Sequence, residues 1–166
     1  MRALGIITLT FAAAGALVQT ANAQGSAPAM KTFTSSAEIQ AMIAKAKKEH
    51  KPGQPIIVQP ILRLAPYGAN LEYRASVGAA ARHVKEAEMF YVIQGSATLV
   101  TGGKLVNEKQ TNAENFTGTA IEGGTEQPVA KGDFVIVPEN TPHWFSPIHG
   151  TIILMSLHVP RPVPEH

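Results

Sequence analysis

From Pro55 onward the chain is a succession of short β-type segments separated by glycine turns, and this pattern limits the folds open to it. Apolar and polar residues alternate over 71–77, and the glycine pairs at 102–103 and 123–124 supply turns. Many short strands at close spacing indicate a single sandwich or barrel rather than a helical or parallel α/β domain. The sequence shows neither an internal repeat nor a second domain.

The first 23 residues have the features of a secretory signal peptide. A positive head, Met1-Arg2, precedes an apolar run from Ala3 to Val18, and Ala21-Asn22-Ala23 supplies a small-x-small cleavage site. An uncleaved membrane anchor is the alternative, but small residues and threonines dilute the run. We therefore predict that residues 1–23 are removed, that 24–34 form a flexible leader, and that the protein is periplasmic or secreted.

Composition excludes several classes of function. The 166 residues contain no cysteine, so neither a disulfide framework nor a thiol enzyme is available. The formal charge is +2, and removal of Arg2 leaves about +1 (2 − 1), which gives no support to a nucleic-acid partner. No second apolar run approaches membrane-spanning length, so we expect no membrane association after signal cleavage.

One amphipathic helix is predicted ahead of the β segments, within residues 35–52. Ser35 and Glu38 fit a capping box at its start, and Pro52-Gly53 stops it. Its apolar residues recur at helical spacing with lysines on the opposite side, which predicts packing against a sheet.

Two stretches combine an apolar strand with a residue type that binds metals. In the strand from Glu88 to Gly95, Glu88 and Phe90 face the same way, and a carboxylate there is costly to bury unless it is paired or bound to a metal. The stretch from Gly132 to His143 has the same build: a glycine turn, an apolar strand, a second turn and a histidine. The two stretches meet either around a metal or only around a core.

These stretches resemble the two motifs of the cupin superfamily. Gly132, five residues, Pro138 and then Pro142-His143 are similar to the second motif, and His83 through Glu88 to Gly95 is similar to the first. The resemblance extends over roughly residues 55–160, and the glycine turns at 102–103 and 123–124 also resemble those of secreted single-domain cupins. It implies an all-β fold, a single cupin barrel (a double-stranded β-helix or jelly roll) over residues 53–160 with one N-terminal α-helix, followed by a proline-rich tail at 161–166.

The resemblance also implies a metal site made of His83, Glu88 and His143. His83 matches the second histidine of the first motif, Glu88 its acid, and His143 the histidine of the second motif. The first histidine of the first motif falls at Ala81, so that ligand is missing. Two imidazoles and one carboxylate can still hold one divalent metal ion, and neutral imidazole suits Fe, Mn, Ni, Co, Cu and Zn alike.

Both motifs require particular backbone geometry. His83 and Glu88 are five residues apart, and an odd separation puts two side chains on opposite faces of a regular strand. We therefore expect a bulge or loop between Val84 and Ala87. Asn140 stands where the second motif has glycine, and asparagine tolerates the left-handed conformation better than other non-glycine residues.

Further residues are candidates for a pocket beside the metal. Arg63 and Arg74 lie inside strand patterns, where they either anchor an anionic substrate or face solvent. Core packing explains the aromatic candidates equally well. The predicted pocket-lining residues are Phe90, Tyr91, Phe145 and, on the last strand, His158.

Two functions remain open at the level of sequence. The first is a metal-dependent enzyme acting on a small molecule by lyase, isomerase or dioxygenase chemistry. The second is a non-catalytic barrel that binds a sugar or other metabolite at a degenerate metal site, which the missing ligand at Ala81 favours. Metal content separates the two, and the resemblance implies a homodimer in either case.

Overall fold

The computed structural model describes residues 30–161 of the 166-residue chain. The predicted signal peptide, the first part of the leader and the last five residues of the tail lie outside the described residues. Within the described range, no helix has the length and apolar character needed to cross a membrane.

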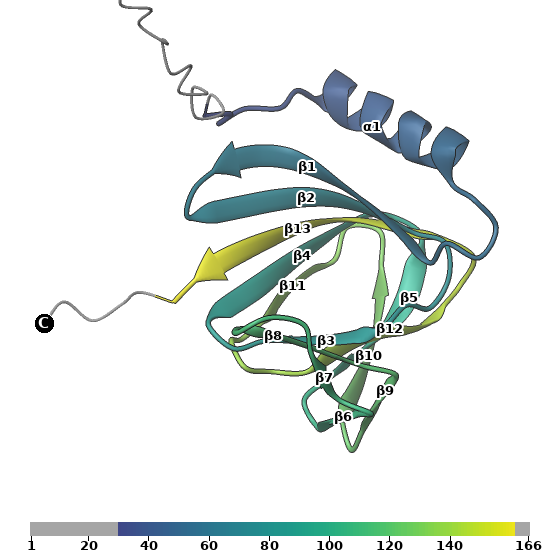
Figure 1. Cartoon of the computed structure of the whole chain (residues 1–166). Helices are drawn as coiled ribbons and strands as arrows, with labels where there is room; N and C mark the ends of the chain where they lie inside the picture. The colour runs from purple at the N-terminus through teal and green to yellow at the C-terminus, as the bar shows by residue number, and fades with distance from the viewer. Residues whose placement is uncertain (1–29, 162–166) are drawn as a thin grey trace, which may run out of the picture.

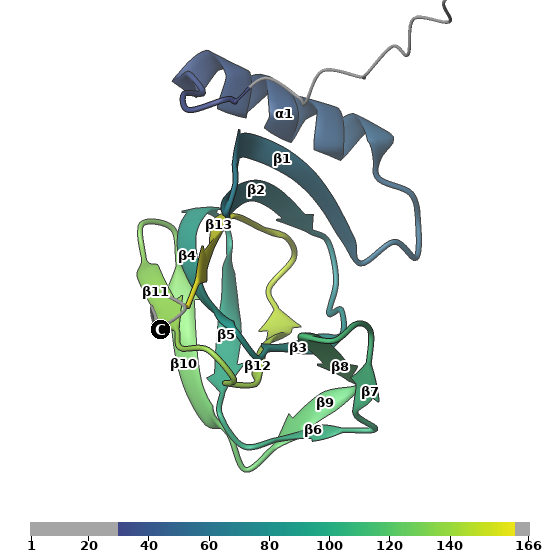
Figure 2. The same cartoon turned by 60° about the vertical axis from the view of Figure 1, so that its left-hand side comes forward.

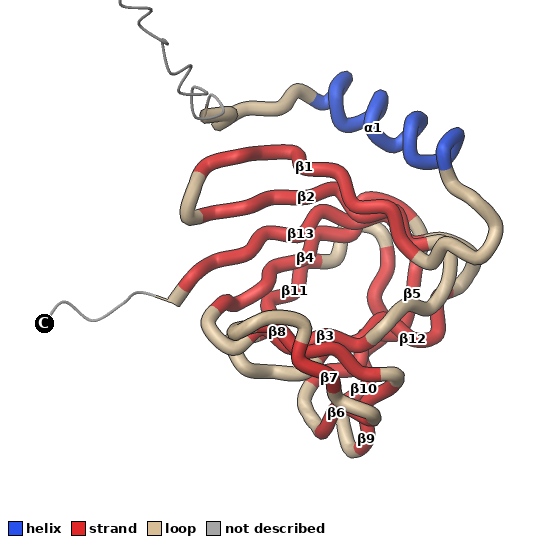
Figure 3. The backbone as a smooth tube through the Cα atoms, viewed as in Figure 1, coloured by secondary structure: helices blue, strands red, loops and turns tan. Residues whose placement is uncertain are grey.

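Strands make up most of the described chain, with one helix ahead of them (Figure 1, Figure 3). The elements are α1 (Ser36–Glu49), β1 (Ile56–Leu64), β2 (Tyr67–Arg74), β3 (Ala80–His83), β4 (Glu86–Gln94), β5 (Ser96–Thr101), β6 (Lys104–Val106), β7 (Lys109–Gln110), β8 (Asn115–Gly118), β9 (Ala120–Glu122), β10 (Thr125–Ala130), β11 (Phe134–Val137), β12 (His143–Ile148) and β13 (Ile152–Pro160).

The strands form two large antiparallel sheets that curve around a shared interior (Figure 2). One sheet has five strands in the order β1-β2-β13-β4-β11, and the other has six in the order β10-β5-β12-β3-β8-β7. A small pair, β6-β9, forms a separate two-stranded sheet. Neighbouring strands within a sheet are mostly distant in sequence, as in a jelly roll. The prediction of an all-β barrel with one N-terminal helix is confirmed.

The larger core cluster fills the space between the two sheets. Phe90 and Leu154 reach it from the five-stranded sheet, and Leu99 and Phe145 reach it from the six-stranded sheet; each is at most 2% exposed. The rings of Phe90 and Phe145 meet edge to face at a centroid distance of 5.1 Å. This packing closes the inside of the barrel below the candidate site.

A second core lies between α1 and the outer face of the five-stranded sheet. Strand alternation divides β13 between the two cores, with Leu154 facing inward and Ile153 facing the helix. Helix α1 contributes Ile43 to this outer core and lies across β1 and β2 (Figure 1, Figure 2). Its capping box, in which Ser35 accepts from the Glu38 amide and Glu38 accepts from the Ser35 amide, is present as the sequence predicted.

The strand that carries Glu88 ends at a position where only glycine fits. Gly95 has φ +86°, and a Cβ there would lie 2.0 Å from the carbonyl oxygen of Thr151. The missing side chain lets the chain turn sharply from β4 in one sheet to β5 in the other.

Candidate metal centre

His83 and Glu88 come together because the chain changes sheets between them. His83 is the last residue of β3 in the six-stranded sheet, residues 84 and 85 form a bend, and β4 begins at Glu86 in the five-stranded sheet. The odd separation is thus resolved by an irregular link, at the place the sequence required one. His83 Nε2 lies 3.2 Å from Glu88 Oε2.

His143 enters from β12 next to the position of the missing histidine. It is paired in register with Ala81 of β3, and its Nε2 lies 3.0 Å from the same oxygen, Glu88 Oε2. The turn before it is held to β3, since the Asn140 amide donates to the His83 carbonyl at 2.6 Å. Asn140 has φ +57°, the left-handed conformation expected where the motif has glycine.

A third imidazole, His158, reaches the site from the last strand, β13. His158 is paired in register with Glu88 of β4, and its Nε2 lies 3.3 Å from Glu88 Oε1. One donor atom each from His83, Glu88 and His158 lie within 4.8 Å of one another, so these three can hold a metal ion. His143 is outside this compact group although it contacts the same carboxylate.

The sequence placed His158 beside the site but not among the ligands. The family motifs cover only the stretches around His83 and His143, so they assign no ligand to the last strand. The available signal was alternation along β13: Ile152 and Leu154 face inward, and every second residue after them, including His158, shares that face.

In each of the three histidines, the ring nitrogen that faces away from Glu88 is bound to an acceptor. His83 Nδ1 donates to Asn115 Oδ1, whose amide orientation is fixed because its Nδ2 donates to Asn112. His143 Nδ1 lies 3.3 Å from the Thr141 carbonyl oxygen, and His158 Nδ1 lies 3.0 Å from Glu86 Oε2. Because these three partners accept, each Nδ1 can donate to its partner, and a neutral ring then presents Nε2 as an acceptor toward Glu88, whereas a ring protonated at both nitrogens also donates to Glu88.

Burial and hydrogen bonding set the protonation of the carboxylate. Burial alone would raise the pKa of Glu88, but hydrogen bonds from His143 and His83 outweigh it and hold the pKa well below its usual range. Burial also opposes charging of His83, whereas hydrogen bonds with Glu88 and Asn115 raise its pKa above the usual value. Glu88 is therefore an anion at neutral pH, as a metal ligand must be.

The donor set fits a divalent metal ion. A metal ion would take the place of the protons between the rings and Glu88: with the rings neutral, the Nε2 atoms of His83 and His158 and the Glu88 carboxylate would be acceptors within one small region, and His143 Nε2 would face the same carboxylate. Protonating all three rings would bury excess positive charge around His143 and Glu88, which are each 4% exposed. The 3.2 and 3.3 Å separations between Glu88 and the Nε2 atoms of His83 and His158 are compatible with ligands of one metal, since two atoms bound at about 2.1 Å lie about 3.0–3.4 Å apart at octahedral or tetrahedral angles.

The predicted pocket-lining residues separate into three environments. His158 lines an open pocket at the mouth of the barrel. Phe90 and Phe145 are fully buried in the barrel core, and the Phe90 ring packs 5.7 Å from the His143 ring. Tyr91 does not line the pocket: strand alternation turns it to the outer surface, where it is 42% exposed and pairs in register with Phe134.

Comparison with known proteins rests on structure alone. No family model matches the sequence, and no curated protein matches it. KdgF from Halomonas sp. is similar over 68% of this chain and 87% of its own, with 13% identity and a TM-score of 0.47. A putative mannose-6-phosphate isomerase from Ralstonia eutropha is similar over 68% of this chain and 92% of its own, with 16% identity and a TM-score of 0.47.

Hydroxypropylphosphonic acid epoxidase from S. wedmorenis is also similar, with 16% identity and a TM-score of 0.47. The match covers 64% of this chain but only 51% of the epoxidase, so this chain spans about half the length of that protein. At such identities these likenesses concern the fold and say nothing of the reaction. The strand order and the inward-facing core are those of an antiparallel double-sheet jelly roll.

Proposed function

We propose that this protein is an exported cupin that binds one divalent transition metal through His83, Glu88 and His143, with His158 as a further ligand, and acts on a small molecule. The observation that carries the proposal is the common orientation of the three imidazoles. Each is fixed through Nδ1 and directs Nε2 at the same buried carboxylate. His158 supplies an imidazole to the site in place of the motif histidine that is missing at Ala81.

A metal held there would supply Lewis acidity or an oxygen-binding position, which is the chemistry that lyases, isomerases and dioxygenases of this fold class need. The chain's own residues prepare the site. Glu86 holds the proton on His158 Nδ1, and Asn115 does the same for His83. Phe90 packs against His143 and keeps water from the inner side of the site.

A non-catalytic binding barrel is the second candidate. The ionisable side chains that line the mouth pocket are Arg63, Tyr67, Glu86 and His158, and the last two are paired with each other. His158 Nε2 faces Glu88 at 3.3 Å, so both ring nitrogens of the imidazole in this pocket are engaged by carboxylates. Such a barrel would capture a metabolite without converting it.

The test is the metal content of purified mature protein after reconstitution, measured by elemental analysis. We expect one transition metal ion per chain in the wild type and a clear loss of occupancy in His143→Ala and in His158→Ala. His50→Ala is the matched control, because His50 lies beyond α1 and bonds the Gln54 carbonyl. A wild type without stoichiometric metal would refute the proposal.

Export is the part of the proposal that rests on the N-terminal sequence. We expect a bacterial host with a periplasm to release the mature chain there, beginning at Gln24. N-terminal sequencing of the purified protein checks this. Retention of Met1 on protein recovered from the cytoplasm would contradict it.

Dimer formation is supported by an exposed apolar strip at the edge of the five-stranded sheet. Phe134 and Ile136 on the edge strand β11 are 61% and 59% exposed, and Tyr91 lies beside Phe134 on β4. We propose that two copies cover this strip together. Phe134→Glu should convert a dimer to a monomer in sedimentation experiments, whereas a wild type that sediments as a monomer would contradict the proposal.

A further inference from the structure

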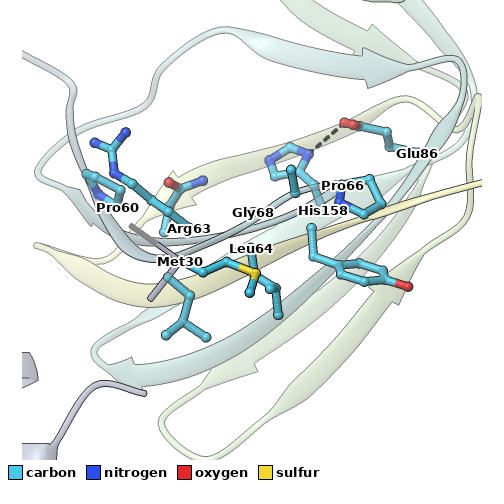
Figure 4. Close-up of a pocket in the computed structure, with 12 residues that line it drawn as sticks. Met30, Pro60, Arg63, Leu64, Pro66, Gly68, Glu86 and His158 are labelled. Carbon is cyan, nitrogen blue, oxygen red and sulfur yellow. Dashed lines mark hydrogen bonds and ion pairs between the residues drawn. The ribbon is translucent and has the colours of Figure 1, made fainter. Parts of the chain in front are cut away.

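The mouth of the barrel contains a pocket of about 840 Å³ that reaches the metal centre at His158 (Figure 4). This volume lies in the range of small-molecule sites, roughly 300–1,000 Å³. Its walls are largely apolar and come from the N-terminal arm and from the β1–β2 hairpin. The apolar surface is contributed by Met30, Pro60, Leu62, Leu64, Ala65, Pro66 and the ring of Tyr67.

Apart from the Tyr67 hydroxyl, four polar side chains line this pocket, and two of them form hydrogen bonds with each other. Glu86 and His158 pair with each other at 3.0 Å, as the dashed line in Figure 4 shows. Within residues 30–161, the Arg63 guanidinium makes no ion pair and the Asn70 amide makes no hydrogen bond. The pocket therefore offers a ligand one positively charged guanidinium, that of Arg63, and one neutral amide, that of Asn70.

Sheet register puts Arg63 in one row with the metal centre. Arg63 of β1 is opposite Gly68 of β2, Gly68 is opposite His158 of β13, and His158 is opposite Glu88 of β4. Directly opposed residues share one face of a sheet, so Arg63 shares the face of His158 and Glu88. At about 4.8 Å per strand, the Cα atoms of Arg63 and His158 are about 10 Å apart.

Gly68 leaves the space between Arg63 and His158 open. A Cβ added at Gly68 would meet no atom within 4 Å. A ligand can thus lie over the backbone of β2, with one end at Arg63 and the other at the metal centre. The wall on this side needs no movement to admit it.

The N-terminal arm fixes the backbone of Arg63. The Lys31 amide donates to the Arg63 carbonyl at 3.1 Å, and the Arg63 amide donates to the Lys31 carbonyl at 3.3 Å. Thr34 Oγ1 donates to the Ile61 carbonyl two residues earlier on the same strand. The arm extends the sheet beyond β1 and brings Met30 to the pocket, so Arg63 projects from a supported strand rather than from a loose edge.

We infer that the pocket binds a small organic acid, with the carboxylate on Arg63 and Asn70 and an apolar body lying over Gly68 toward the metal centre. The inference rests on the proposed function, since it names the class of molecule that the metal site would receive. A single guanidinium beside a neutral amide suits a monoanionic carboxylate, which binds the fork through two parallel hydrogen bonds. A phosphate ester carries more charge than one arginine balances, and no lysine lines the pocket.

The experiment measures ligand binding by NMR titration with straight and branched carboxylic acids of four to eight carbons, each compared with its neutral primary amide. We expect at least one acid to bind, its amide to bind about tenfold more weakly, and Arg63→Gln to weaken the acid by about tenfold as well. Lys131→Gln is the matched control, because it removes one positive charge from the turn between β10 and β11. Metal content is measured on every sample.

The outcomes separate this inference from the metal proposal. Titrations are run on the reconstituted protein and on protein treated with a chelator, since Arg63 does not depend on the metal for its position. Binding of acids that requires Arg63 supports the inference whether or not metal is found. The inference is overturned if no acid in the panel binds, or if the amides bind as well as the acids. It is also overturned if inorganic phosphate displaces the acids at equal concentration, or if Arg63→Gln binds the acids as tightly as the wild type does.

Discussion

Replacement of Glu88 by Gln is expected to reduce metal affinity by more than about 100-fold. Glutamine keeps the shape of the side chain but removes the anion that contacts all three imidazoles. Loss of a group that merely orients a ligand costs about 10–100-fold in metal affinity, and loss of the charged ligand itself should exceed that. Competition against a metal-binding dye, read alongside elemental analysis, gives the ratio.

The Glu88→Gln experiment needs a control for folding and one for charge. Glu126→Gln removes a carboxylate from the exposed strand β10 and should bind metal as the wild type does. A far-ultraviolet circular dichroism spectrum of Glu88→Gln should retain the β signal, because the core below the site does not depend on the carboxylate. Full metal occupancy in a folded Glu88→Gln protein would remove Glu88 from the site.

Local rules were sufficient to predict the strand that carries Glu88. Alternation put Glu88 and Phe90 on the inner face, and the structure buries both, at 4% and 0% exposure. The requirement for an irregular link after His83 followed from the same rule. The prediction for Tyr91 did not follow strand alternation. Tyr91 was predicted to line the pocket because of its neighbours in sequence, although alternation directs its side chain outward.

The parts that sequence could not supply are those created by pairing between distant strands. Asn115 fixes His83 from 32 residues away, and Glu86 fixes His158 from 72 residues away. The row from Arg63 through Gly68 to His158 depends on register, including an irregularity between Pro60 and Leu62 that decides which way Arg63 faces. A single residue of slip would turn Arg63 to the outer face.

A buried ion pair inside the barrel leads to the largest expected effect on stability. Arg74 donates from Nε and Nη2 to Glu72 Oε2 at 2.8 and 2.7 Å, and Ser156 Oγ donates to Glu72 Oε1 at 2.8 Å. The guanidinium carbon lies 4.8 Å from the centre of the Phe145 ring. Glu72 is only 5% exposed, and Arg74 is the cation that pairs with it among residues 30–161.

Arg74→Met should lower the free energy of unfolding by about 3–5 kcal/mol. Methionine keeps much of the packing on Phe145, but the buried Glu72 carboxylate is left with a single hydroxyl donor. Adding Glu72→Gln to Arg74→Met removes the unpaired buried charge and should restore a large part of the lost free energy of unfolding. Urea unfolding of the two single variants and the double variant measures the coupling.

Arg82, which also donates from Nη1 to Asn140 Oδ1, provides a comparison in which the acidic partner is more exposed. Its guanidinium also lies over an aromatic ring, 4.2 Å from the centre of Phe116, and it pairs with Glu108 at 2.8 Å, but the Glu108 side chain is 39% exposed. Solvent screens that pair, so Arg82→Met should cost about 1 kcal/mol or less. Equal losses of unfolding free energy in Arg74→Met and Arg82→Met would mean that burial does not set the strength of the Arg74–Glu72 pair. The Glu72 carboxylate would then reach water despite its low exposure.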